Sequence, residues 1–143
     1  MSWTYNFKDH TADIAVDIEA DSLNELFTAA AFSLRESISD DKIVGLSESK
    51  SLTFHDESLE ILLVDFLSEL NFLFQSESWM MSSVHYLDIS KELDIWNLLV
   101  VIVGGNFNRN QMKLKSEIKA VTYHQMAIQE INGQFCTRIV FDI

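Results

Sequence analysis

The stretch DIAVDIEADSLNELFTAAAFSLRESI, residues 13–38, changes its hydrophobic period once, and this change decides the fold class. Its first part, residues 13–20, alternates apolar and polar residues as a half-buried strand does. From Leu23 onward the apolar residues recur every three or four positions, which is typical of one face of a helix. Ser22, followed three residues later by Glu25, is the capping-box signature of a helix start. The stretch therefore predicts a strand that leads into a helix.

A second helix and several more strands are predicted in the rest of the chain. Residues 56–75 keep the helical period over four turns. Alternating or β-branched apolar runs predict strands at residues 3–7, 50–55, 80–90 and 93–105. Gly104-Gly105 and the Asn-rich residues up to about 112 predict a turn region.

The chain is expected to end in a β-hairpin. Its arms are residues 117–131 and 134–143, joined at Asn132-Gly133, a dipeptide that favours the type I′ turn. Consecutive strands without helices between them favour an α+β fold. We expect a mainly antiparallel sheet with two helices packed on one face, a two-layer single domain over residues 1–143.

The composition of the chain argues against several classes of function. The chain has 143 residues, 48% of them hydrophobic, which is typical of one globular domain. Its net charge of −12 argues against tight nucleic-acid binding and favours a basic protein surface or a cation as partner. Cys136 is the only cysteine, so a reducing cytoplasm is the simplest setting. We see no signal peptide, and the longest apolar run, residues 95–105, is too short to cross a membrane.

Four polar residues near the N-terminus are the first candidate site: Asp9, His10, Thr11 and Asp13. Asp9 or Thr11 can cap a turn, with Asp13 opening a strand in solvent. Alternatively, Asp9 and Asp13 supply oxygen ligands to a hard cation such as Ca²⁺ or Mg²⁺, with His10 as a supporting group. The residue types alone leave both interpretations open.

The C-terminus supplies further carboxylates. Asp142 and the α-carboxylate of Ile143 lie on adjacent residues at the end of the last predicted strand. If that strand runs beside the strand that starts at Asp13, three carboxylates converge. Carboxylates that close repel one another, and a bound cation is the usual remedy. The hypothesis is a split acidic site built from both ends of the chain.

Catalytic motifs are missing from the chain. It contains no HExxH, no G-x-S-x-G and no phosphate-binding glycine loop. One rival hypothesis is a metal-dependent hydrolase that uses Asp9, His10, Asp13 and Asp142, with His10 or His124 as base. Another is an interaction domain whose carboxylate cluster holds nothing.

Five segments occur in the order and at the spacing of one known family. They are DHTADI, SLNELFTAAAFSL, LLVDFLSELNFLF, EIKAVTYHQM and the terminal FDI. Over essentially its whole length the chain resembles the archease family. The resemblance implies a non-enzymatic accessory protein of tRNA splicing or RNA repair. Such a protein activates an RtcB-type RNA ligase by promoting its guanylylation and multiple turnover.

The resemblance also implies a divalent-metal site, for calcium in particular. Its carboxylates correspond to Asp13 and Asp142, with the terminal Ile143 carboxylate adjacent. Lys119 in KAVTYH is a candidate for a functional contact, as are Asp9, His10 and His124 in supporting positions.

The chain departs from the family pattern in one loop. Gly105 and Met112 stand where many archeases have an acidic residue and a histidine. The role of the loop over residues 104–116 in this protein is therefore open.

Overall fold

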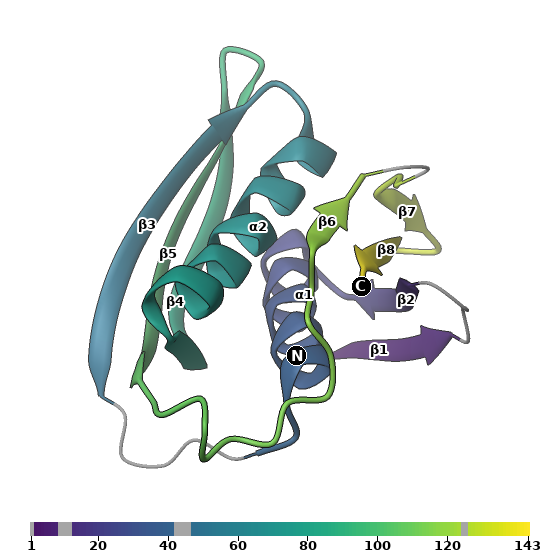
Figure 1. The fold of residues 1–143 in the computed structure, drawn as a ribbon. Helices are drawn as coiled ribbons and strands as arrows, with labels where there is room; N and C mark the ends of the chain where they lie inside the picture. The colour runs from purple at the N-terminus through teal and green to yellow at the C-terminus, as the bar shows by residue number, and fades with distance from the viewer. Residues whose placement is uncertain (1, 9–12, 42–46, 124–125) are drawn as a thin grey trace.

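The computed structural model of the protein describes residues 2–8, 13–41, 47–123 and 126–143 (Figure 1). Its elements follow in the order β1 (Trp3–Lys8), β2 (Asp13–Ala20), α1 (Leu23–Ile38), β3 (Glu48–Asp56), α2 (Leu59–Glu77), β4 (Trp79–Glu92), β5 (Ile95–Asn106), β6 (Ala120–Thr122), β7 (Gln129–Ile131) and β8 (Gln134–Asp142). No helix in the described part of the chain is long and apolar enough to span a bilayer.

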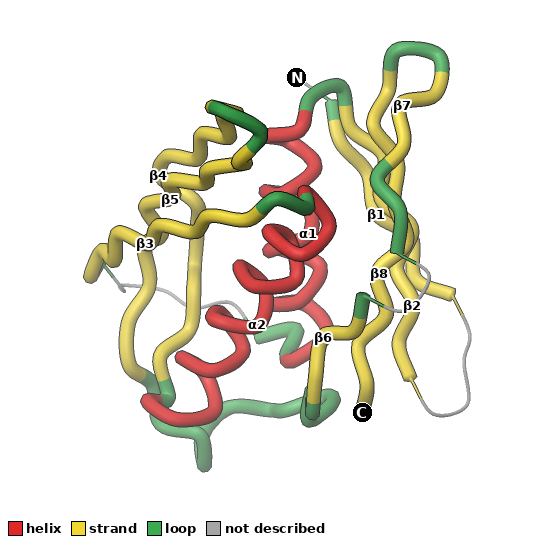
Figure 2. Tube along the Cα trace, turned by 90° about the horizontal axis from the view of Figure 1, so that it is seen from above, coloured by secondary structure: helices red, strands yellow, loops and turns green. Residues whose placement is uncertain are grey.

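The strands form two antiparallel sheets. One sheet has the order β1-β2-β8-β6, with β7 also paired to β8, and the other has the order β3-β5-β4. Figure 2 shows both helices between the two sheets, and each helix contacts strands of both. The α+β class with two helices and antiparallel strands is confirmed. The strands are divided between two sheets, whereas a single sheet with both helices on one face was expected.

The burial of the helices explains the second sheet. A helix with a single apolar stripe needs cover on one side only, whereas a helix that is apolar over a wider arc needs cover on two. Helix α2 buries consecutive residues as well as its i, i+3, i+4 stripe: Leu62, Leu63, Val64, Phe66, Leu67, Leu70, Asn71, Leu73 and Phe74. Helix α1 likewise buries the run Ala29, Ala30 and Ala31. Both helices are therefore core elements that separate the sheets.

Helix α1 begins as its capping sequence predicts, but only half of the capping box forms. The Ser22 hydroxyl accepts a hydrogen bond from the Glu25 N–H at 3.1 Å, a contact that stabilises a helix start by about 1 kcal/mol. The Glu25 carboxylate accepts from the Ser2 N–H at 3.0 Å. The cap of α1 thus also holds the start of β1.

The final hairpin has the predicted turn and an interrupted first arm. Asn132 and Gly133 have φ values of 53° and 80°, as a type I′ turn requires. The expected arm over residues 117–131 is divided into β6 and β7, both of which pair with β8. The prediction of one continuous arm is therefore wrong.

Gly104 and Gly105 lie inside β5, so the prediction that they form a turn is also wrong. Gly104 is buried against β4. A Cβ atom there would lie 2.9 Å from the Met81 Cα and closer still to the carbonyl oxygen of Met80. The β4 backbone passes too close to leave room for a side chain at this position. Close approach of another backbone is a known reason for glycine inside a strand.

Candidate carboxylate site at the ends of β2 and β8

The last strand does run beside the strand that begins at Asp13. Asp13 opens β2 and is the cross-strand partner of Asp142 near the end of β8. Residues directly opposite each other in an antiparallel pair have Cβ atoms about 5 Å apart and side chains on the same face. Ile143, the last residue of the sequence, follows Asp142. The pairing therefore brings Asp13, Asp142 and Ile143 to one end of the sheet.

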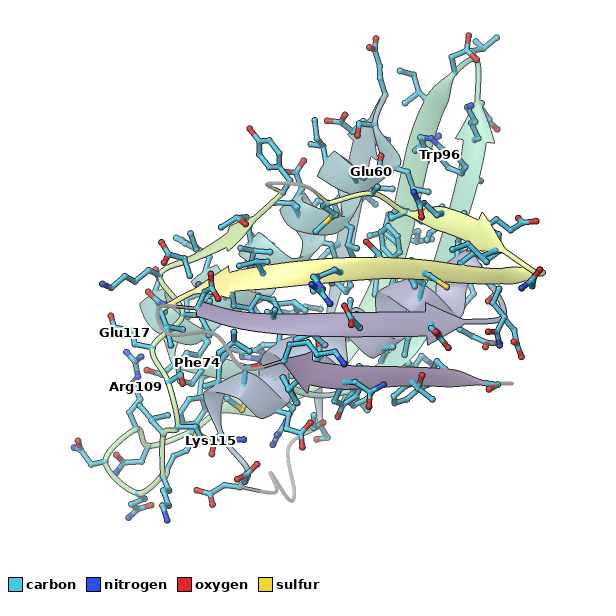
Figure 3. The ribbon with its side chains drawn as sticks, turned by 90° about the vertical axis from the view of Figure 1, so that its right-hand side faces the viewer. Glu60, Phe74, Trp96, Arg109, Lys115 and Glu117 are labelled. Carbon is cyan, nitrogen blue, oxygen red and sulfur yellow. The ribbon has the colours of Figure 1, made fainter. Side chains whose placement is uncertain are left out.

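Core packing holds this register. Val16 and Ile18 of β2 and Ile139 and Phe141 of β8 are at most 1% exposed and belong to the main hydrophobic core. They alternate with residues on the outer face of the sheet, which is the face turned away from the helices. Figure 3 shows this face, with β8, β2 and β1 side by side. A slip of one residue would turn every side chain to the opposite face. The helix-facing apolar residues thus determine that Asp13 and Asp142 meet on the outer face.

The same register produces an ion pair further along the two strands. Asp17 is the cross-strand partner of Arg138, which donates to the Asp17 carboxylate from Nε at 2.6 Å and from a terminal nitrogen at 3.0 Å. Lys8 lies 3.7 Å from the same carboxylate. The hydrogen bonds from Arg138, more than any other contact, lower the pKa of Asp17 below its ordinary value. One carboxylate of β2 thus faces a cation across the sheet, whereas Asp13 faces a second carboxylate.

Asp13 and Ile143 line one pocket together with two lysines. The pocket is lined by Phe7, Lys8, Asp13, Ile14, Ser37, Lys115, Ser116 and Ile143. Lys8 interacts with Asp17, as described above, and Lys115 lies 3.0 Å from the carboxylate of Asp40. Carboxylates and lysines therefore share the rim of this pocket.

Sequence analysis missed both lysines. The place of Lys8 could have been inferred from the sequence by pairing β1 with β2. That pairing sets Lys8 opposite Ala15, on the same face as Asp13. Lys115 lies on the irregular segment between β5 and β6 (Figure 3) and reaches the pocket because its N–H donates to the carbonyl of Ile38 at 2.8 Å. No periodic pattern carried that contact.

Lys119 lies beside the carboxylates through its main chain. Its N–H donates to the carbonyl of Asp142 at 2.7 Å. The preceding carbonyl, of Ile118, accepts hydrogen bonds from Asn71 and Gln75 of α2. The exposed Lys119 side chain lines a second pocket, together with Gln75 and Phe72. Helix α2 thus positions Lys119, whose side chain lines a different pocket from that of Asp13.

The donor atoms suit a hard cation. Asp13, Asp142 and Ile143 offer only carboxylate oxygens, which Ca²⁺ and Mg²⁺ prefer and which zinc sites rarely use alone. Among the side chains of the described residues, no group of three or more Asp, Glu, His and Cys is placed to hold a metal ion. The other predicted site residues, Asp9, His10 and His124, lie outside the described residues.

Known proteins of one family are similar to this chain over nearly its whole length. A model of the Archease protein family matches residues 5–143. Protein archease of Methanosarcina barkeri is 30% identical over 97% of this chain and 95% of its own length. Protein archease of Thermococcus kodakarensis is 32% identical over 94% of this chain and 95% of its own.

Two solved structures share the fold. A solution structure of a Methanobacterium thermoautotrophicum protein has a TM-score of 0.82 at 26% identity and covers 97% of this chain and 98% of its own. A Thermotoga maritima crystal structure, described as an archease and possible chaperone, has a TM-score of 0.61 at 26% identity and covers 95% of this chain and 94% of its own.

Proposed function

This chain belongs to the archease family, and on that premise we propose that it activates an RtcB-type RNA ligase. In this role it promotes guanylylation of the ligase and allows the ligase repeated turnover, in tRNA splicing or RNA repair. It acts in the cytoplasm and catalyses no reaction of its own. The description of the Thermotoga maritima relative as a possible chaperone supports an accessory role.

The pairing of Asp13 with Asp142 beside the terminal carboxylate carries the proposal. Like charges directly opposite each other destabilise a sheet, so their presence here favours a functional use. A divalent cation, Ca²⁺ in particular, relieves the repulsion and is bound by Asp13, Asp142 and the Ile143 carboxylate. Such a cation supplies positive charge that can be brought to the nucleotide site of the ligase.

The residues around the site have separate roles in this proposal. Asp13 and Asp142 hold the cation at the end of two central strands, where the backbone fixes their spacing. The exposed Lys119 side chain contacts the partner beside the site. The net charge of −12 favours approach to the cationic nucleotide and RNA sites of a ligase.

A ligation time course with RNA in excess over ligase tests the proposal. The ligase is incubated with GTP and a divalent cation, with wild-type protein, Asp13→Asn, Asp142→Asn or no addition. Asp88→Asn is the matched control, because Asp88 is exposed on the three-stranded sheet and its replacement removes the same charge. We expect wild type and the control to support several turnovers, and both site variants to support about one.

If the site variants support as many turnovers as wild type, the carboxylate site has no role in activation. If the ligase without added protein makes as many turnovers as with wild type, this protein does not activate the ligase. Hydrolysis of phosphoesters by the purified protein and metal alone would favour the rival enzyme hypothesis. If no divalent cation raises the melting temperature, the site binds none, because a ligand of the native state must stabilise it.

A further inference from the structure

Strand β1 is an open edge of the five-stranded sheet. It pairs with β2 on one side, and within the described residues no strand pairs with its other side. Figure 3 shows β1 at this edge, beside β2 and β8. An open edge presents main-chain donors and acceptors that can pair with another strand.

The hydrogen-bond pattern shows which residues of β1 face outward. The Asp21 N–H donates to the carbonyl of Ser2 at 3.0 Å, so Ser2 and Asp21 form a hydrogen-bonded pair of the ladder. Such pairs alternate with non-hydrogen-bonded pairs along two antiparallel strands. The N–H and C=O groups of Trp3, Tyr5 and Phe7 therefore point away from β2, toward the open edge.

The same three residues form a row of aromatic rings. The ring centroids of Trp3 and Tyr5 are 5.9 Å apart, and those of Tyr5 and Phe7 are 5.6 Å apart. Phe32 of α1 stacks on Trp3 at 6.1 Å. Trp3 is 36% exposed and Phe7 is 42% exposed. An added strand would find both main-chain partners and apolar surface along one line.

The other edges carry features that resist pairing. Strand β3 has four charged or titratable residues, namely Glu48, Lys50, His55 and Asp56. Strand β4 has two register shifts along its pairing with β5, and β6 has only three residues. Lys8 is the only charged residue of β1, which has no proline and pairs with β2 without a shift. Charges, bulges and short length are the usual protections of an edge. Of these, β1 has only the single charge of Lys8 at its end.

Glu19, Glu25 and Glu36 lie around this edge, against the single lysine of β1, Lys8. Glu19 lies on β2 opposite Thr4. On the helix side, the Tyr5 hydroxyl donates to Glu36 at 2.6 Å, and Glu25 accepts from the N-terminal end of the strand, as described above. An added strand would lie about 5 Å from β1, which places these charges within or near the screening distance of about 10 Å. The edge therefore attracts a basic strand.

We propose that β1 is a docking edge for an extended segment of another protein. The segment adds to the sheet as a further strand, with apolar side chains against Trp3, Tyr5 and Phe7 and with Lys or Arg on its other face. Main-chain hydrogen bonds supply affinity, and the alternating side chains supply specificity. A second copy of this chain is a poor occupant, because each copy carries a net charge of −12. The docking edge does not depend on the ligase proposal, because it needs neither a metal nor the Asp13–Asp142 pair.

Two synthetic octapeptides test the edge. One alternates valine with lysine, and the other alternates valine with glutamate. Each is titrated into the full-length protein while the backbone amides are followed by NMR. We expect the lysine peptide to bind, to shift the amides of β1 first and most, and to bind more weakly as salt is raised. The glutamate peptide should not bind measurably.

A proline substitution isolates the main-chain contribution. Trp3→Pro removes an outward N–H and leaves the ladder with β2 intact, whereas Trp3→Ala removes the ring and keeps the N–H. We expect Trp3→Pro to bind the lysine peptide about tenfold more weakly than Trp3→Ala, the effect of roughly one hydrogen bond. Thermal unfolding checks that both variants fold.

Three results would overturn the proposal. They are shifts confined to amides outside β1, equal binding of the two peptides, and equal affinity of folded Trp3→Pro and Trp3→Ala. If Trp3→Pro fails to fold, shift mapping on the wild type still supports or rejects the edge. The alternative occupant of the edge is a second copy of this chain, and sedimentation of the protein alone tests for it. If the wild type forms a dimer and Trp3→Pro is a monomer, the edge binds a second copy and the proposal of a partner segment is wrong.

Discussion

Replacing Asp142 with asparagine should stabilise the protein when no divalent cation is present. The change is nearly isosteric and removes one of two carboxylates that face each other across β2 and β8. Most surface substitutions are neutral or destabilising. A gain in stability from a side chain of the same shape is therefore a specific signature of relieved repulsion.

The size of the gain follows from the strand geometry. Directly opposed side chains lie about 5 Å apart, and two unit charges at that distance in water repel by about 0.8 kcal/mol. For a chain of this size such a change raises the melting temperature by about 2–3 °C. Salt should reduce the gain, because Asp142 is exposed and Asp13 is only half-buried.

The assay compares thermal unfolding of wild type, Asp142→Asn and Asp17→Asn in a chelator. Asp17 is the matched control because it lies on the same face of β2, and its cross-strand partner is Arg138 rather than a carboxylate. We expect Asp142→Asn to melt above wild type and Asp17→Asn to melt below it. If both variants melt below wild type by similar amounts, the Asp13–Asp142 pair is not repulsive and the reasoning is wrong.

Calcium should reverse the order. At a hundred times its dissociation constant, a ligand stabilises the native state by about 2.7 kcal/mol. Wild type should gain this stabilisation, whereas Asp142→Asn should lose most of it. Wild type would then melt above Asp142→Asn in calcium and below it in chelator.

Further predictions concern pH, packing and backbone conformation. The hydrogen bonds from its cross-strand arginine lower the pKa of Asp17 from its ordinary 3.8, so their stabilisation is present above pH 3.8 and is lost as pH falls through the lowered value. Melting curves in acid should show this loss in wild type and not in Asp17→Asn. Burial, followed by the hydrogen bond to Glu36, raises the pKa of Tyr5 from 10.0 to about 12. The folded state should therefore lose stability as pH rises through that interval, and Tyr5→Phe should remove this loss. Gly104→Ala should cost about 1–3 kcal/mol in denaturant unfolding through backbone overlap. Gly133→Ala, with open space and a φ of 80°, should cost about 1–2 kcal/mol through backbone conformation alone.

The hydrophobic period of the sequence was sufficient to predict the helices and strands that lie against the core. Strand β2 begins and ends where the alternation does, and α1 begins after the predicted cap at Ser22. The meeting of Asp13 with Asp142 was also within reach, because it required only that the first and last long strands be neighbours. Once that pairing is assumed, the antiparallel register also sets Asp17 against Arg138. Opposite charges at that second pair could have supported the assumption.

Other features depend on contacts that have no period. A wide apolar arc on α2 does not say whether one sheet or two cover it. Gly104 resembles a turn residue in sequence and is in fact a point of close approach between strands. Lys115 reaches the pocket only because its irregular segment is tied to Ile38. Each of these outcomes is decided by the packing of distant segments, which a single sequence does not display.

The carboxylate site is built before any cation arrives, and an energy comparison shows why. Repulsion between Asp13 and Asp142 is below about 1 kcal/mol. Sliding β8 by one residue to escape it would expose Ile139 and Phe141, each worth about 1.5–3 kcal/mol when fully buried. Burial of the core residues therefore outweighs the repulsion, and the register keeps the two carboxylates opposite each other. A site preorganised in this way spends little binding energy on ordering its ligands. The like-charge pair is the local cost of a register that the core imposes, and cation binding can recover it.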